Sequence, residues 1–228
     1  TFFITGNIPA AELKPLVEKY IGSLPATDSR EKWVDWGIRP PRGKQEQEIE
    51  FMGLPSSIVV LSMTREMDYN IRHNICLEAL KSILQTRCMN VIREKEGGTY
   101  AVNVNQGVVY EPVAQYSMIV EFQCDPLNAA KLKGIVYGEL ERLRQQVPSR
   151  DELMMALNSI RKKEGEARES NVYWQEKLVL YYRTGLNQAD VREFEEIVDK
   201  LTPEDFLEFV REFWENVDIT DVVFKPKS

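Results

Sequence analysis

The chain has 228 residues, enough for one large domain or for one domain with part of another. Hydrophobic residues make up 43 % of the sequence and charged residues 29 %, which is ordinary for a globular protein with a core and argues against disorder. The net charge is −7, and the longest basic cluster, residues 161–163, is followed at once by acids, which argues against nucleic-acid binding. No stretch approaches the roughly 18 consecutive apolar residues of a membrane-spanning helix.

The first 44 residues are expected to form a short strand, a helix and a linker. Phe2–Thr5 is a short apolar run that ends at the turn-forming pair Gly6-Asn7, which predicts a strand and a turn. Within Ala10–Gly22 the apolar residues recur at the spacing of one helical face, which predicts a helix. Residues 26–44 carry prolines, charges and two tryptophans, so we expect a linker that packs on a surface.

The rest of the chain predicts a unit of strands and helices. Strands are expected at Ser57–Met63, Thr99–Tyr110, Gln115–Gln123 and Ile219–Phe224, with Thr99–Tyr110 and Gln115–Gln123 adjacent and antiparallel, whereas Glu46–Phe51 alternates polar and apolar residues only weakly. Helices are expected over Asp68–Arg93, from Asp125 to about Gln146, after Ser149, over Tyr173–Tyr182 and after Thr202. This order predicts the α+β class, as a two-layer α/β sandwich with a mostly antiparallel sheet and helices packed on one face.

The sequence leaves the compartment open. The chain starts in a strand-like run without an initiator Met, so we expect a piece of a longer protein whose targeting segment could lie upstream. The three cysteines, Cys76, Cys88 and Cys124, lack metal-ligand spacing and are expected to be free thiols, with Cys76 buried. A bacterial cell envelope or periplasm and a cytoplasm both fit this pattern.

Familiar catalytic motifs are missing from the sequence. His73 is the single histidine, whereas a catalytic zinc site needs three protein ligands, and its surroundings do not form a zincin motif. We therefore expect a surface or helix-capping histidine, and no metal site or catalytic residue in this chain. The acid pairs Glu195-Glu196 and Glu204-Asp205 lie in helical contexts and are expected to be solvated faces or caps.

One segment has the residue types for binding a peptide. Arg93 and Tyr100 lie seven residues apart across Gly97-Gly98, where a predicted helix turns into a predicted strand. A guanidinium and a directed hydroxyl on one side of the turn could hold a peptide carbonyl or a developing oxyanion. The alternative is structural: Arg93 is a cation at a helix C-terminus and Tyr100 is a residue that favours strands.

At this segment, REKEGGTY, the sequence resembles the insulinase/pitrilysin family of zinc metallopeptidases, which are inverted zincins. Phe2–Pro25 is similar to the strand, glycine and helix that end one structural unit of that family. Val147–Trp174 resembles the helices after the sheet, and Leu201–Trp214 resembles the closing helix. The resemblance covers nearly the whole chain and identifies it as the C-terminal, non-catalytic portion of such a protein.

The resemblance implies a role and a division into domains. Residues 1–25 would end the preceding structural unit, 26–44 would link, and 45–228 would form the C-terminal peptidase-family domain. Arg93 and Tyr100 would bind the backbone of a peptide substrate, and this portion would close the chamber against an N-terminal catalytic half. Zinc would belong to that half of the parent protein, so this chain alone would be inactive.

Two other interpretations stay open. The chain could be a non-catalytic scaffold or protein-interaction domain on the same fold, since some family members serve as scaffold subunits. It could also be an unrelated α+β interaction module, which a different fold would establish. The substrate, the cleavage preference and the oligomeric state are not determined by the sequence.

Overall fold

The computed structural model describes residues 1–25, 34–53, 55–95, 101–187 and 190–227. They divide into two compact units, which are described separately. The smaller unit comprises Thr1–Ile38 and Gly165–Ala189, and the larger comprises Arg39–Glu164 and Asp190–Ser228.

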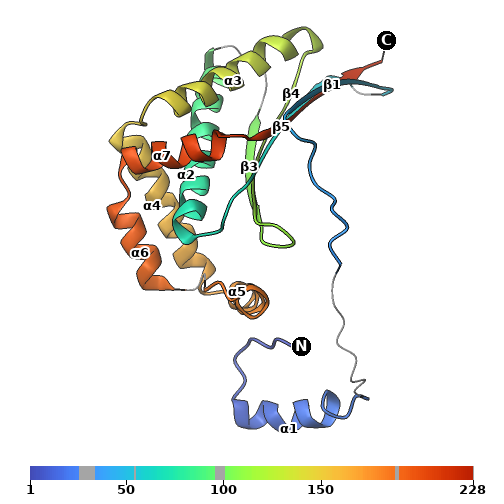
Figure 1. Cartoon of the computed structure of the whole chain (residues 1–228), viewed down its shortest axis with the longest axis vertical. Helices are drawn as coiled ribbons and strands as arrows, with labels where there is room; N and C mark the ends of the chain where they lie inside the picture. Colours follow the sequence, from blue (N-terminus) through green and yellow to red (C-terminus); the bar gives the residue numbers. More distant parts are fainter. Residues whose placement is uncertain (26–33, 54, 96–100, 188–189, 228) are drawn as a thin grey trace. The chain divides into compact units, whose positions relative to one another are not determined.

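The larger unit is built on one five-stranded sheet (Figure 1). Its strands are β1 (Lys44–Phe51), β2 (Ser57–Glu66), β3 (Val102–Val109), β4 (Gln115–Cys124) and β5 (Asp218–Pro226). They lie in the order β1-β5-β2-β4-β3, and every pairing is antiparallel except the parallel pairing of β1 with β5. The predicted adjacent, antiparallel pair formed by the third and fourth strands is confirmed.

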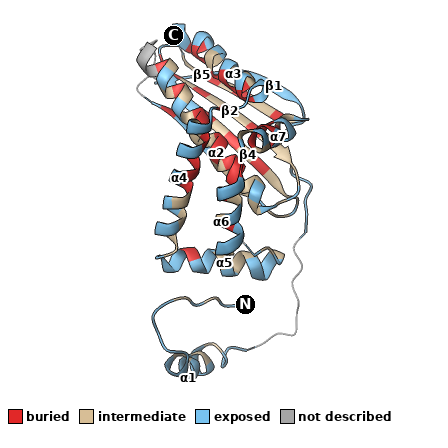
Figure 2. Ribbon diagram, turned by 90° about the vertical axis from the view of Figure 1, so that its left-hand side faces the viewer, coloured by how far each residue is buried: buried red, intermediate tan, exposed pale blue. Residues whose placement is uncertain are grey.

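The helices of the larger unit pack on one face of this sheet (Figures 1 and 2). They are α2 (Ile71–Cys88), the π-helix η1 (Met89–Lys95), the short 3₁₀ turn η2 (Pro126–Asn128), α3 (Ala129–Gln145), α4 (Arg150–Ala167, whose last residues belong to the smaller unit), α6 (Val191–Lys200) and α7 (Pro203–Trp214). The predicted fold class, a two-layer α+β sandwich with a mostly antiparallel sheet, is confirmed. The predicted single helix over 68–93 is instead α2 continued by η1.

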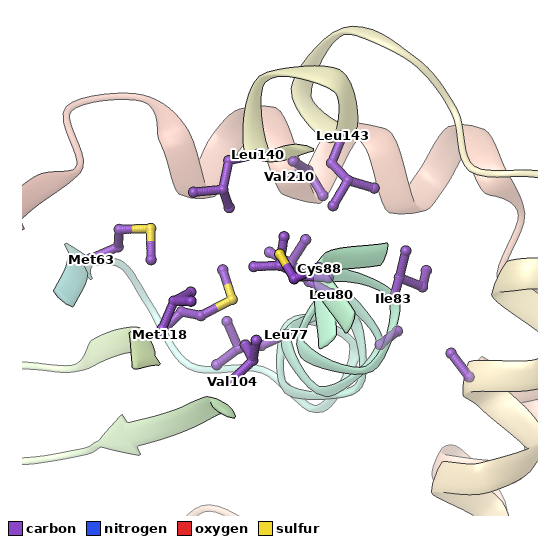
Figure 3. Close-up of a cluster of buried hydrophobic side chains, with 14 of the residues drawn as sticks. Met63, Leu77, Leu80, Ile83, Cys88, Val104, Met118, Leu140, Leu143 and Val210 are labelled. Atoms are coloured by element: carbon purple, nitrogen blue, oxygen red, sulfur yellow. The ribbon is translucent and has the colours of Figure 1, made fainter. Parts of the chain in front are cut away.

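The core lies between the sheet and helices α2, α3 and α7. Alternate residues of β2 from Ser57 to Met63 are fully buried, as the pleat of a strand covered on one face requires. Figure 3 shows the side chains that meet there: Met63, Val104 and Met118 from the sheet, Leu77, Leu80, Ile83 and Cys88 from α2, Leu140 and Leu143 from α3, and Val210 from α7. This packing makes α2 the central helix of the unit.

Local capping signals are realised where the sequence places them. The hydroxyl of Ser149 accepts from the N–H of Glu152 (3.2 Å), and the Glu152 carboxylate accepts from the N–H of Ser149 (3.0 Å). Thr202 and Asp205 form the same reciprocal box at the start of α7, at 3.1 and 3.0 Å. Each box satisfies two backbone donors that a helix start leaves without a partner.

The smaller unit contains α1 (Ala10–Tyr20) and α5 (Asn171–Thr184). The predicted strand over Phe2–Thr5 is wrong. Instead the Phe3 ring lies edge-on to Tyr182 at 5.4 Å, and the hydroxyl of Thr5 donates to the carbonyl of Asn171 at 3.1 Å. A strand needs a neighbouring strand for its backbone groups, and the described part of this unit contains none. Helix α1 has no buried residue, and its apolar side chain Leu16 is half exposed.

Candidate functional site

The predicted site lies between the end of η1 and the start of β3. The backbone of Arg93 belongs to the last turn of η1, which places this cation at a helix C-terminus, as both interpretations of the sequence require. The Arg93 side chain and the whole of Tyr100 lie outside the described residues. Their role as substrate binders therefore stays a prediction, and the structure instead describes the elements that flank them.

The helical flank is fixed by burial and by one two-point ion pair. Cys88 and Ile92 are fully buried, so the end of α2 and the start of η1 are anchored in the core. The Arg87 guanidinium donates to both carboxylate oxygens of Glu152 on α4, at 2.9 and 3.1 Å. This pairing holds the pKa of Glu152 below its ordinary value. The chain therefore leaves α2 from a fixed position.

The strand flank is fixed by two side chains of the same helical segment. The Gln85 side-chain amide donates to the carbonyl of Val102, and its oxygen accepts from the N–H of Val104 at 2.7 Å. The sulfur of Met89 accepts from the N–H of Val102 at 3.4 Å. Both valines are buried. Residues 93 and 101 are thus attached to one rigid body, α2 with its π-helical extension.

Sequence reasoning did not single out Gln85. A glutamine in the middle of a helix carries no local signal, because its partners follow it by 17 and 19 residues. Only the packing of α2 beside the start of β3 shows that its amide takes the place of a neighbouring strand.

His73 does not offer a metal site. Its N–H donates to the Asn70 side chain, the N-cap of α2, at 2.7 Å, so it stands in the first turn of a helix. The imidazole lies between the rings of Tyr116 and Phe209, and its Nε2 is 3.6 Å from a carboxylate oxygen of Glu212. The expected alternatives are a surface histidine and a helix-capping one; the side chain is only 21 % exposed, and the residue lies in the first helical turn, where Asn70 is the cap.

The described residues do not fit a catalytic zinc ion. No group of three or more His, Cys, Asp or Glu side chains stands close enough together to hold a metal within the described ranges. Of the acid pairs, Asp205 caps α7 as expected, whereas Glu195 binds Arg161 at 2.7 Å and Glu196 lies 3.5 Å from Lys200. Backbone and hydroxyl donors of Thr202 hold the pKa of Asp205 below its ordinary value.

The cysteines are unsuited to nucleophilic chemistry. All three are free and buried, which confirms the expectation for Cys76. Burial raises the pKa of Cys76 and of Cys88 to about 12, and it also raises the pKa of Cys124. A thiol of this kind is protonated near neutral pH, whereas the thiolate is the reactive form. Separately, none of the described helices is both long and apolar enough to cross a membrane.

The fold and these contacts define a two-layer α+β domain whose central helix, α2, holds the start of the edge strand β3 through Gln85. Residues 1–160 match the family model described as the peptidase M16 inactive domain, and the chain therefore belongs to that family. The expected relationship to insulinase-type zinc proteases, as their inactive C-terminal domain, is confirmed.

Named relatives agree with this family. The chain is 29 % identical over 135 residues to the probable zinc protease PqqL of Haemophilus influenzae, a match that covers 58 % of this chain and 14 % of that protein. It superimposes on the crystal structure of the periplasmic protease PqqL from Escherichia coli with a TM-score of 0.79 and 19 % identity, covering 97 % of this chain and 25 % of that one.

The same fold also occurs in the first half of that protease. The separate crystal structure of the first half of Escherichia coli PqqL matches with a TM-score of 0.72 and 14 % identity, covering 95 % of this chain and 49 % of that one. The chain thus spans between about a seventh and a quarter of the full-length relatives it resembles. At such identities the structural matches establish the fold alone.

Proposed function

We propose that this chain is the substrate-holding, zinc-less portion of an M16 metalloendopeptidase. In this proposal an N-terminal half of the same protein supplies the zinc ion and the general base, and the chain closes the chamber and binds the peptide backbone through Arg93 and Tyr100. The division into residues 1–25, 26–44 and 45–228 belongs to the same proposal.

The observation that carries the proposal is the double anchoring of the segment by α2. The Arg87–Glu152 pair and the buried Ile92 fix its start, and Gln85 fixes the strand that follows it. A binding group is effective when its attachment is rigid, because less conformational entropy is lost when the ligand binds. In the sequence, Arg93 and Tyr100 lie between α2 and β3, and Gln85 of α2 holds the start of β3.

The family and the relatives support the choice of ligand. A domain described as inactive, in relatives named as zinc proteases, fits a portion that handles the peptide while another portion carries the metal. Main-chain carbonyls are acceptors for a guanidinium and a phenol, so recognition by these two groups would depend little on the substrate's side chains. We therefore expect a broad preference for peptides.

The test is peptide hydrolysis by the whole protein that contains this chain. Arg93→Ala and Tyr100→Phe are compared with wild type at matched zinc content and matched melting temperature. We expect each to lower kcat/KM by about 10- to 100-fold, the effect of one lost hydrogen bond to the transition state. Arg192→Ala and Tyr181→Phe, at exposed positions on α6 and α5, serve as controls and are expected to leave kcat/KM unchanged.

The opposite outcomes are equally clear. Unchanged hydrolysis in both variants would return Arg93 and Tyr100 to a structural role. No hydrolysis by wild-type protein loaded with zinc would favour the scaffold function.

A further inference from the structure

The two edges of the sheet differ in chemistry. Edge strand β1 carries charge at every second position, Lys44, Glu46, Glu48 and Glu50, and charged edges discourage pairing with another strand. Edge strand β3, Val102–Val109, contains no charged residue and no proline. Charged residues and proline are what usually prevent another strand from pairing with a sheet edge, and β3 has neither, so a further strand can pair with its free side.

The contacts of Gln85 show which backbone groups face outward from β3. Because Val102 and Val104 bond to Gln85 instead of β4, their N–H and C=O groups point away from the sheet. Directions alternate along a strand, so those of Gln106 and Val108 point the same way. The carbonyl of Gly107, which accepts from the Ser117 hydroxyl of β4 at 3.2 Å, points inward, as this alternation requires.

Gln85 therefore occupies only the first half of the edge. Its amide serves Val102 and Val104 as a neighbouring strand would. Among the described residues, no partner bonds to the outward backbone groups of Gln106 and Val108. The open window is bounded by Gln85 on one side and by the end of β3 at Val109 on the other.

We propose that this window binds an extended peptide, which adds to β3 as a sixth strand. The peptide backbone would donate to and accept from Gln106 and Val108, a recurring mode of peptide recognition. The choice of a peptide as ligand rests on the proposed function. An uncharged segment rich in β-branched residues fits best, because the window offers valine and glycine and no charge.

The length of the window favours a peptide over a second copy of the chain. Two outward-facing residues pair with a segment of about three to five residues. A stable dimer buries roughly 800 Å² on each partner, which this short edge could not supply by itself.

The test uses the peptide Thr-Val-Thr-Val-Thr-amide, with fluorescein coupled to its N-terminus through a flexible linker, and a series in which each residue in turn is N-methylated. Binding to the whole protein is measured by fluorescence anisotropy, with the zinc removed so that no hydrolysis intervenes. Strand addition predicts that N-methylation weakens binding about tenfold at alternate residues and has little effect at those between. It also predicts slower hydrogen exchange at the amides of Gln106 and Val108.

A variant of the protein tests whether the peptide binds at the outward edge of β3. Val108→Pro removes one outward N–H at an edge position, where proline is tolerated, and is expected to weaken binding about tenfold. Val109→Thr, whose backbone faces β4 and whose side chain is half exposed, is the matched control and should bind normally. If Val108→Pro does not fold, the N-methyl series and the exchange measurement still decide.

Three results would overturn strand addition. They are equal or absent effects along the N-methyl series, unaltered binding by folded Val108→Pro, and self-association of the peptide-free protein that Val108→Pro abolishes. Failure here is distinguishable from failure of the proposed function. If Arg93→Ala and Tyr100→Phe lower peptide hydrolysis but the N-methyl series shows no alternating effect on binding, strand addition is wrong and the proposed function stands. If the N-methyl series alternates but neither variant lowers hydrolysis, the proposed function is wrong and strand addition stands.

Discussion

Asp221 on β5 and Lys133 on α3 form an ion pair of 3.0 Å inside the helix–sheet layer, where the Asp221 side chain is 1 % exposed. The hydroxyl of Tyr137 donates to the same carboxylate at 3.0 Å. The negative charge raises the pKa of Tyr137, although burial is the larger cause. This cluster joins the first half of α3 to β5, which lies between β1 and β2 in the sheet.

Breaking this pair is expected to be costly. Asp221→Asn leaves the Lys133 ammonium without its partner, and we expect the free energy of unfolding to fall by about 3 kcal/mol. Urea denaturation followed by circular dichroism measures it. The double variant Asp221→Leu with Lys133→Met should recover most of the loss, because no lone charge then remains at the interface. A single substitution that costs less than about 0.5 kcal/mol would contradict the account.

The Arg87–Glu152 pair should make stability depend on pH. The folded-state pKa of Glu152 lies below its ordinary value of 4.5, so the pair stabilises the protein above that pH and loses its effect as pH falls through the lowered pKa. Arg87→Met is expected to cost about 1 kcal/mol at neutral pH, since the pair is partly screened by solvent. Near pH 3 the difference from wild type should shrink.

Urea midpoints at the two pH values test this, with Arg192→Met, at an exposed position on α6, as the control. A difference between Arg87→Met and wild type that is the same at both pH values would assign the effect to packing of the arginine stem instead of to charge.

The same substitution should have a large effect on one helix and almost none on another. Leu80 is buried on α2 in the core of Figure 3, and Leu80→Ala is expected to lower the free energy of unfolding by about 2–5 kcal/mol through lost burial and a residual cavity. Leu16 on α1 is half exposed, and Leu16→Ala should change the free energy of unfolding by no more than about 0.5 kcal/mol. Chemical denaturation of both variants compares them directly.

A large loss from Leu16→Ala in the whole protein would mean that another segment covers α1. That result would support the proposed assignment of residues 1–25 to a preceding structural unit.

Local signals in the sequence predicted local structure well. The capping residues Ser149 and Thr202 mark helix starts because their partners lie three residues away. The buried strand β2 and the hairpin-like pair β3 and β4 follow from β-branched runs. Helix α6 was not delimited in advance, although its start is fixed locally by Asp190, which accepts from the N–H groups of Arg192 and Glu193.

Elements that depend on distant partners were predicted poorly. The apolar run Phe2–Thr5 has the composition of a strand, but composition cannot show whether another strand stands beside it. Similarly, a clean helical pattern over 68–93 does not show that the last turns widen into η1. For the candidate site, the sequence and its family resemblance singled out Arg93 and Tyr100, and nothing in the sequence pointed to Gln85.

The class of the fold, the main helices and strands, and membership of the M16 inactive-domain family follow from the amino-acid sequence alone. The fold class and its elements rest on periodicity, caps and turn residues, whose physics acts within a few residues, and the family membership rests on the match of residues 1–160 to the family model. Two features follow from the three-dimensional packing. One is the strand order, in which β1 pairs in parallel with β5 although Lys44 and Ile219 are far apart in the chain. The other is the edge of β3, of which Gln85 covers only the first half. Backbone hydrogen bonds between distant segments depend on which surfaces pack together, and a linear pattern does not record that choice.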